Sequence, residues 1–168
     1  YFESKGGSVL DAIQGAAEVG NVPLYTSLLE TTGKESRFPR DSLLYGLGKG
    51  NQRKLIESLP EKTTNDTFDI IQGAAAGGHI DLIQDLLEQN THIRKSSLIK
   101  SILYGAGSGA HRSIVEQFLS KNFKSKNVVA LGAAYGNQLE YFKEIIQANT
   151  INDLELVTTM ALDYVIEN

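Results

Sequence analysis

A short pattern of small and apolar residues recurs five times along the chain. Each copy contains a glycine that is followed by further small residues. These five anchor glycines are Gly15, Gly46, Gly73, Gly105 and Gly132. In the third copy an apolar pair, Leu82 and Ile83, begins nine residues after the anchor, and a second pair, Leu86 and Leu87, follows four residues later. Residues four apart lie on one face of a helix, so the pattern predicts an apolar helix stripe in each copy.

Another helix is predicted in every copy. It begins just upstream of the small residues and continues through them, so it is the first of the two helices in its copy. Glycine inside a helix costs about 1 kcal/mol relative to alanine. Five glycines in register therefore require a packing reason, and we expect neighbouring helices to approach closely there. The expected N-caps of these first helices are Ser8, Asp41, Thr67, Ser97 and Ser125.

The sequence thus predicts an all-α solenoid of about five stacked helix-turn-helix repeats, forming a single domain over residues 1–168. The expected repeats span roughly residues 8–37, 40–64, 66–94, 97–123 and 125–150. The tail lacks an anchor glycine but carries an amphipathic stripe, so residues 153–168 are expected to form a capping helix. Because the chain opens at Tyr1 and its single methionine is Met160, we expect it to be part of a longer polypeptide.

Composition narrows the class of protein. Hydrophobic residues make up 41% and charged residues 21% of the chain, which is typical of a globular domain. No apolar run approaches the ~20 residues of a membrane helix, so no transmembrane segment is predicted. The chain has no cysteine, which suits a reducing compartment, and we expect a cytoplasmic protein. A net charge of −4 gives no general argument for nucleic-acid binding.

The third copy resembles the ankyrin repeat family. Residues 69–79, with their run of small residues ending in Gly77, Gly78 and His79, are in register with that family's motif, as are the two apolar pairs. The second half of the motif matches well, whereas its first half is degenerate. His111 occupies the same place in the fourth copy. The resemblance covers about residues 8–150, although two repeat spacings are shorter than the family's. It implies a curved stack of ankyrin-like helix pairs whose concave groove binds another protein.

The resemblance also implies which residues face the groove. The candidates after the paired small residues are Glu18, Lys49, Ala76, Ser108 and Tyr135. They differ in charge and size, as residues of a recognition surface do, although unconstrained solvent positions would differ in the same way. Tyr45 and Tyr104 each precede an anchor glycine, where a tyrosine serves either packing or partner binding.

Basic residues are concentrated in one segment. Seven of them lie between His92 and Lys126, where Glu116 is the single acid. The candidate basic edge comprises Arg94, Lys95, Lys121, Lys124 and Lys126. Such an edge would attract an acidic protein, an anionic lipid headgroup or RNA, or would simply be solvated.

No catalytic or cofactor motif stands out. His79 and His111 are at repeat turns, where we expect each imidazole to bond backbone, and no histidine pair has metal-ligand spacing. We therefore expect no metal, no cofactor and no enzymatic activity within this chain. The predicted function is a protein-protein interaction scaffold. The alternatives are a targeting or regulatory arm of an enzyme outside this sequence, and an electrostatic binder that uses the basic edge.

Overall fold

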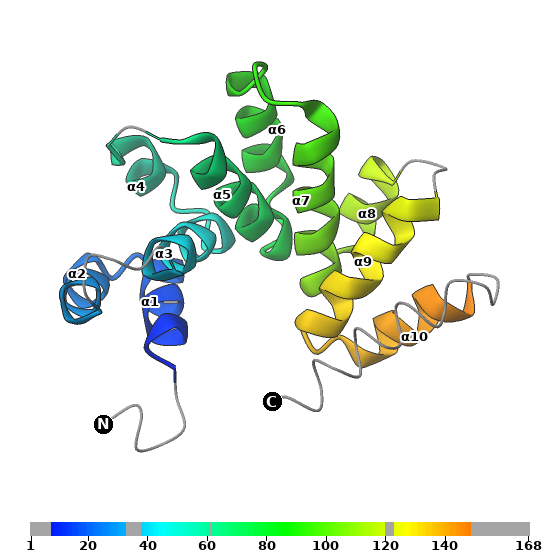
Figure 1. The fold of residues 1–168 in the computed structure, drawn as a ribbon, viewed down its shortest axis with the longest axis horizontal. Coiled ribbons are helices and arrows are strands. Elements are labelled where there is room, and N and C mark those ends of the chain that lie inside the picture. Colours follow the sequence, from blue (N-terminus) through cyan, green and yellow to red (C-terminus); the bar gives the residue numbers. More distant parts are fainter. Residues whose placement is uncertain (1–7, 33–37, 61, 120–122, 149–168) are drawn as a thin grey trace.

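The computed structural model describes residues 8–32, 38–60, 62–119 and 123–148. These residues form ten α-helices and contain no strand, so the predicted all-α class is confirmed (Figure 1). The predicted capping helix at 153–168 lies outside the described residues.

The helices pair as five consecutive hairpins. The first helices are α1 (Val9–Glu18), α3 (Phe38–Lys49), α5 (Thr64–Ala76), α7 (Lys95–Ser108) and α9 (Phe123–Tyr135). The second helices are α2 (Val22–Thr31), α4 (Arg53–Ser58), α6 (Ile80–Gln89), α8 (Arg112–Phe118) and α10 (Leu139–Gln147). From the second hairpin onward, each first helix begins two residues before the expected start of its repeat.

The hairpins are arranged in series. Each first helix packs against the first helix of the next hairpin, from α1 through α3, α5 and α7 to α9. Each second helix packs against its own first helix. Figure 1 shows the hairpins following one another along an arc in chain order, from the blue α1 to the orange α10. The described chain is therefore two helical layers deep.

The same turn closes every hairpin. In the third hairpin the N–H of His79 donates to Ala74 O (2.9 Å) and the N–H of Gly78 donates to Ala75 O (3.2 Å). This pair of bonds is a Schellman motif, which places one residue in the left-handed region. That residue is Gly20, Asn51, Gly78, Ala110 or Asn137 in the five turns, all with φ between 54° and 80°.

Four of the five anchor glycines lie against the backbone of the preceding hairpin. A Cβ on Gly73 would come within 2.0 Å of Tyr45 O, and one on Gly105 within 2.1 Å of Gln72 O. Gly46 and Gly132 face Gln14 O and Tyr104 O in the same way. The predicted close approach is therefore confirmed at these four positions. A Cβ on Gly15, in the first hairpin, would meet no atom of the described residues within 4 Å.

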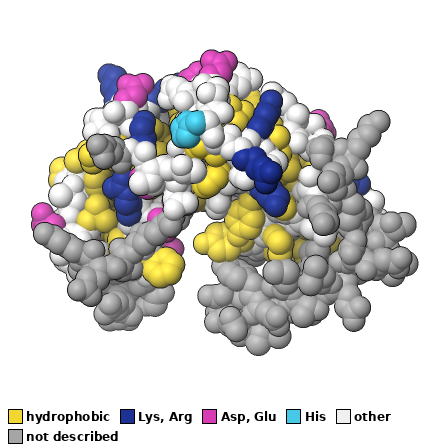
Figure 2. Space-filling view, turned by 45° about the horizontal axis from the view of Figure 1, so that its top comes forward, with side chains coloured by type: hydrophobic (Ala, Val, Ile, Leu, Met, Phe, Trp, Pro, Cys, Tyr) yellow, Lys and Arg dark blue, Asp and Glu magenta, His cyan; other side chains and the backbone are white. Residues whose placement is uncertain are grey.

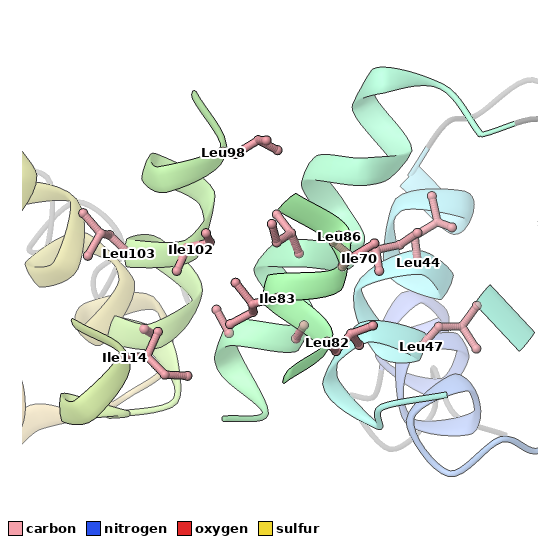
Figure 3. Close-up of a cluster of buried hydrophobic side chains, with 14 of the residues drawn as sticks. Leu44, Leu47, Ile70, Leu82, Ile83, Leu86, Leu98, Ile102, Leu103 and Ile114 are labelled. Carbon is pink, nitrogen blue, oxygen red and sulfur yellow. The ribbon is translucent and has the colours of Figure 1, made fainter. Parts of the chain in front are cut away.

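The hydrophobic core runs between the two layers. Figure 3 shows side chains of α6, namely Leu82, Ile83 and Leu86, among those of the neighbouring first helices. Ile70, Ile71 and Ile83 are completely buried. Each such side chain contributes about 1.5–3 kcal/mol by burial. At the beginning of the chain the core is thinner, because α2 has no buried residue.

Second helices of neighbouring hairpins are joined by ion pairs in equivalent places. Arg53, the first residue of α4, pairs with Asp85 of α6. Arg112, the first residue of α8, pairs with Glu144 of α10. All four side chains are more than one-third exposed, so each pair contributes at most about 1 kcal/mol.

Helix ends agree only partly with the sequence prediction. Ser8 caps α1 by accepting a hydrogen bond from Leu10 N (3.1 Å), as predicted. The other four predicted N-caps are wrong, because α3, α5, α7 and α9 start upstream of Asp41, Thr67, Ser97 and Ser125. Thr63 caps α5 instead, in a capping box with Asp66. The C-cap of α6 is Asn90, and α4 ends at Ser58, before Pro60.

Candidate partner-binding groove

Two adjoining hollows form a groove along the first helices. The larger has a volume of about 370 Å³, and its lining includes residues from all five first helices. The smaller, of about 160 Å³, shares Gln14, Tyr45 and Tyr135 with it. Because Gln14 belongs to α1 and Tyr135 to α9, the groove brings together the two ends of the arc. We call these two hollows the groove.

Five of the seven predicted groove residues line the larger hollow. They are Tyr45, Lys49, Ala76, Ser108 and Tyr135. Glu18 does not line it, but its carboxylate lies 3.0 Å from Lys49 Nζ. Tyr104 does not line it either, but its ring lies 5.9 Å from that of Tyr135, tilted by 48°. Each of the seven therefore lines the groove or contacts a residue that does.

Their convergence follows from the repeat register. The residue before the anchor glycine and the residue three after it are four apart, so they share one face of the first helix. Because the first helices pack in series, this face forms a continuous wall from α1 to α9. Tyr45 and Lys49 of α3 illustrate the spacing, and both line the larger hollow.

Several lining residues were missed by the sequence analysis. They are Asp11, Gln14, Asp41, Ser42, Asp69, Gln72, Gly109, Gly136 and Gln138. Gln14 and Gln72 occupy the same repeat position as Tyr45 and Tyr104, directly before an anchor glycine. A polar residue at that position, between apolar residues and small ones, was the signal available in the sequence.

The two turn histidines join consecutive hairpins. Nε2 of His79 lies 2.8 Å from Lys49 O, and Nε2 of His111 lies 2.9 Å from Ala76 O. Gln52 takes the equivalent place one hairpin earlier, and its Nε2 donates to Glu18 O at 2.9 Å. The prediction that these imidazoles bond backbone is therefore confirmed. Each of these side chains thus joins its own hairpin to a backbone carbonyl at the end of the preceding first helix.

The predicted basic edge is not gathered into one site. Arg94 precedes α7, and Lys95 is its first residue; both are exposed. Lys95 lines a hollow between α6 and α7, whereas Lys126 of α9 lines a different, apolar hollow beside α8 and α10. Lys121 lies outside the described residues, and Lys124 is the second residue of α9. Figure 2 shows Lys and Arg side chains on both halves of the face that it displays.

Arg112 is engaged within the structure. Besides pairing with Glu144, its guanidinium lies 5.2 Å from the centre of the Tyr141 ring, a cation–π contact. Both interactions hold α8 against α10, which makes a structural role the simplest account of this cation.

The described residues offer little for other chemistry. They contain no group of three or more histidine or acidic side chains that could hold a metal ion. Among the described helices, none has the length and apolar character needed to span a bilayer. Comparison of the chain with family models, curated proteins and solved structures finds no match. The functional proposal is therefore based on the fold and the groove alone.

Proposed function

We propose that this chain is an ankyrin-like solenoid that serves as an interaction module and binds a partner protein in the groove. One observation carries the proposal: residues at a repeated register position, different in each hairpin, line a single hollow of about 370 Å³. A position used only for packing would repeat one residue type, as the anchor glycines do. Variation on a fixed frame is what recognition of a specific partner requires.

The lining is suited to a polypeptide. Tyrosine is enriched among the residues that contribute most to protein interfaces, and Tyr45 and Tyr135 both line the groove. Tyr135 is 53% exposed, which is high for a large aromatic side chain. The lining amides and hydroxyls, such as Gln14 and Ser108, supply hydrogen bonds of both polarities.

Affinity capture with matched variants tests this proposal. The groove variant carries Lys49→Ala and Tyr135→Ala, and the control carries Leu139→Ala. Leu139 is 57% exposed, close to Tyr135, and does not line the groove. We expect the native chain and the control to recover the same partner, and the groove variant to recover at least tenfold less. Equal recovery by the groove variant would reject this face as the binding site.

A second candidate function is electrostatic binding of RNA or anionic lipid by the basic edge. The first turns of α1, α3 and α5 each contain an acid, whereas those of α7 and α9 contain none. Arg94 and Lys95 are exposed at that end of α7. Binding to such an edge falls steeply with salt. Salt-insensitive binding, or no binding at low salt, would remove this candidate.

A further inference from the structure

A slot recurs where each hairpin meets the one before it. One wall is a backbone carbonyl of the preceding hairpin, which belongs to the third residue after the anchor glycine of that hairpin. The other is a glycine of the next hairpin, four residues after its own anchor. A Cβ added to these glycines would come within 1.8–2.3 Å of the carbonyl oxygen. Examples are a Cβ on Gly77 with Lys49 O and a Cβ on Gly109 with Ala76 O. We call this feature the hairpin slot.

Three of the four hairpin slots are filled by the chain itself. In each, a planar side chain reaches the carbonyl through an N–H donor: Gln52 in the first, His79 in the second and His111 in the third. The distances from Nε2 to the carbonyl oxygen are 2.8–2.9 Å. The slot therefore accepts both an imidazole and a carboxamide.

The fourth hairpin slot has the same walls but is not filled in this way. A Cβ on Gly136 would lie 2.1 Å from Ser108 O, which matches the other three slots. The corresponding side chain is Gln138, but its Nε2 donates to Gly136 O of its own turn, at 3.2 Å. Among the described residues, no hydrogen bond to Ser108 O is formed.

This fourth slot opens into the groove. Ser108, Gly109, Gly136 and Gln138 all line the larger hollow. Ser108 O accepts no hydrogen bond from the described residues, so it gains from a donor when a bound ligand displaces water, because a polar group removed from water without a partner costs about 1–3 kcal/mol.

We propose that the fourth hairpin slot is the anchoring subsite of the groove and takes a planar N–H donor side chain of the partner. A histidine, glutamine or asparagine of the bound segment donates to Ser108 O, as Gln52, His79 and His111 do in the other slots. This inference deepens the proposed function and rests on it, since the groove holds the segment that carries the donor. An acidic side chain is excluded, because a carboxylate cannot donate and would face a carbonyl oxygen.

The turn beside the fourth slot has the same backbone conformation as the turn beside the filled second slot. Ala110 occupies the left-handed turn position before the fourth slot, with φ 54°. Asn51 occupies the equivalent position before the second slot, also with φ 54°, and there His79 reaches Lys49 O.

A nuclear magnetic resonance titration tests the slot without a known partner. The probe is N-acetyl-histidine N-methylamide, added to the ¹⁵N-labelled chain about 1.5 pH units above the ordinary histidine pKa of about 6.5, so that the imidazole is neutral. We expect saturable shifts of the backbone amides of Gly136 and Gln138. The amides of Gly50 and Gly77, at filled slots, should not respond. N-acetyl-leucine N-methylamide, which lacks a side-chain N–H, should give no such shifts.

Two variants with the same substitution complete the test. Gln138→His places an imidazole where His79 and His111 have theirs, so its own ring fills the fourth slot and probe affinity falls at least tenfold. Gln52→His changes a slot that is already filled and should leave probe affinity unchanged. The slot proposal is overturned if the fourth-slot amides do not respond, if the leucine probe shifts them equally, or if Gln138→His binds the probe as tightly as the native chain.

Failure of this inference is distinguishable from failure of the proposed function. If the probe binds the fourth slot but the groove variant captures the partner normally, the groove is not the partner site while the slot stands. If the groove variant loses the partner but the probe does not bind, the slot proposal alone is rejected.

Discussion

At the scale of single residues, glycine sets how closely the hairpins approach one another. The anchor glycines of the second to fifth hairpins lie against a carbonyl of the preceding first helix, where no side-chain carbon fits. Gly15 has the same place in its helix but no neighbour within 4 Å. The sequence predicted one role for all five glycines, and the structure separates them by whether a preceding hairpin is packed there.

This difference predicts opposite effects of one substitution. Gly73→Ala forces a Cβ to within 2.0 Å of Tyr45 O, so the two helices must move apart, and we expect a loss of about 2–4 kcal/mol in unfolding free energy. Gly15→Ala meets open space and should gain up to about 1 kcal/mol from helix propensity. Urea unfolding of the two variants measures both changes. Equal destabilisation by the two would contradict the close-approach explanation.

A second residue-scale prediction concerns Ala110. It has φ 54°, a left-handed conformation that costs a residue with a Cβ about 1–2 kcal/mol. Ala110→Gly should therefore raise the unfolding free energy by about 0.5–1 kcal/mol. The reverse change at the equivalent turn, Gly78→Ala, should lower stability, because its Cβ would meet the His111 ring at 2.7 Å. Thermal unfolding midpoints that move in the same direction for both variants would refute this account.

At the scale of helices, the start of α5 depends on contacts that cross between hairpins. Asp66 accepts hydrogen bonds from Arg40 Nε (3.2 Å) and Nη2 (3.0 Å) of α3, and from Thr63 N (2.8 Å). Burial raises the pKa of the Asp66 carboxyl, but the hydrogen bonds from Arg40 and Thr63 outweigh it and hold that pKa below its ordinary value. The capping box therefore fixes the start of α5 and joins it to the preceding hairpin.

The pKa shift gives a prediction with a definite sign. Because the Asp66 pKa is lower in the folded than in the unfolded chain, its contribution to stability is present above the ordinary value of 3.8 and is lost as pH falls through the folded pKa. Asp66→Asn should cost about 2 kcal/mol at neutral pH. The difference from the native chain should shrink below about pH 4.

The matched control for this experiment is Asp81→Asn. Asp81 also lies in the first turn of its helix, α6, but it is exposed. Its substitution should change stability by no more than about 0.5 kcal/mol. Urea unfolding across pH measures both variants. A constant cost of Asp66→Asn down to strongly acidic pH would show that the carboxylate charge does not matter.

Helix boundaries show where sequence reasoning reached its limit. Ser8 was recognised because a cap with a serine hydroxyl is local, but Thr63 was passed over in favour of Thr67. Thr67 is buried and lies inside α5, and its hydroxyl bonds Thr63 O and Asn90 Oδ1. The local sequence does distinguish the two threonines, because Thr63 is followed three residues later by Asp66, the spacing of a capping box, whereas Thr67 is followed there by Ile70.

At the scale of the whole molecule, each hairpin is stabilised mainly by contacts with the hairpins next to it. Among the described residues, the extensive contacts between first helices follow sequence order, from α1 to α9. A loss of packing in a middle hairpin therefore weakens the hairpins on both sides, whereas a loss of packing in an end hairpin weakens one.

Two isoleucines of equal burial test this expectation. Ile71 of α5 and Ile13 of α1 are both completely buried. Each change to alanine removes the same atoms and should cost about 2–5 kcal/mol locally. Amide hydrogen exchange should show that Ile71→Ala weakens protection in α3, α5 and α7, whereas Ile13→Ala weakens only α1 to α3. Uniform loss of protection in both variants would mean that the molecule unfolds as a single unit.

The sequence by itself determined that this chain is helical and that its helices come in hairpins of fixed register, because spacing along one helix is set by local geometry. The resemblance to ankyrin repeats led to the prediction of the face on which Lys49, Ser108 and Tyr135 lie. Only the tertiary structure decided that residues as distant as Gln14 and Tyr135 share one hollow, and that Gln138 turns away from Ser108 O while His79 and His111 reach their carbonyls. Those outcomes depend on the distance and angle between hairpins, which packing of many side chains sets together.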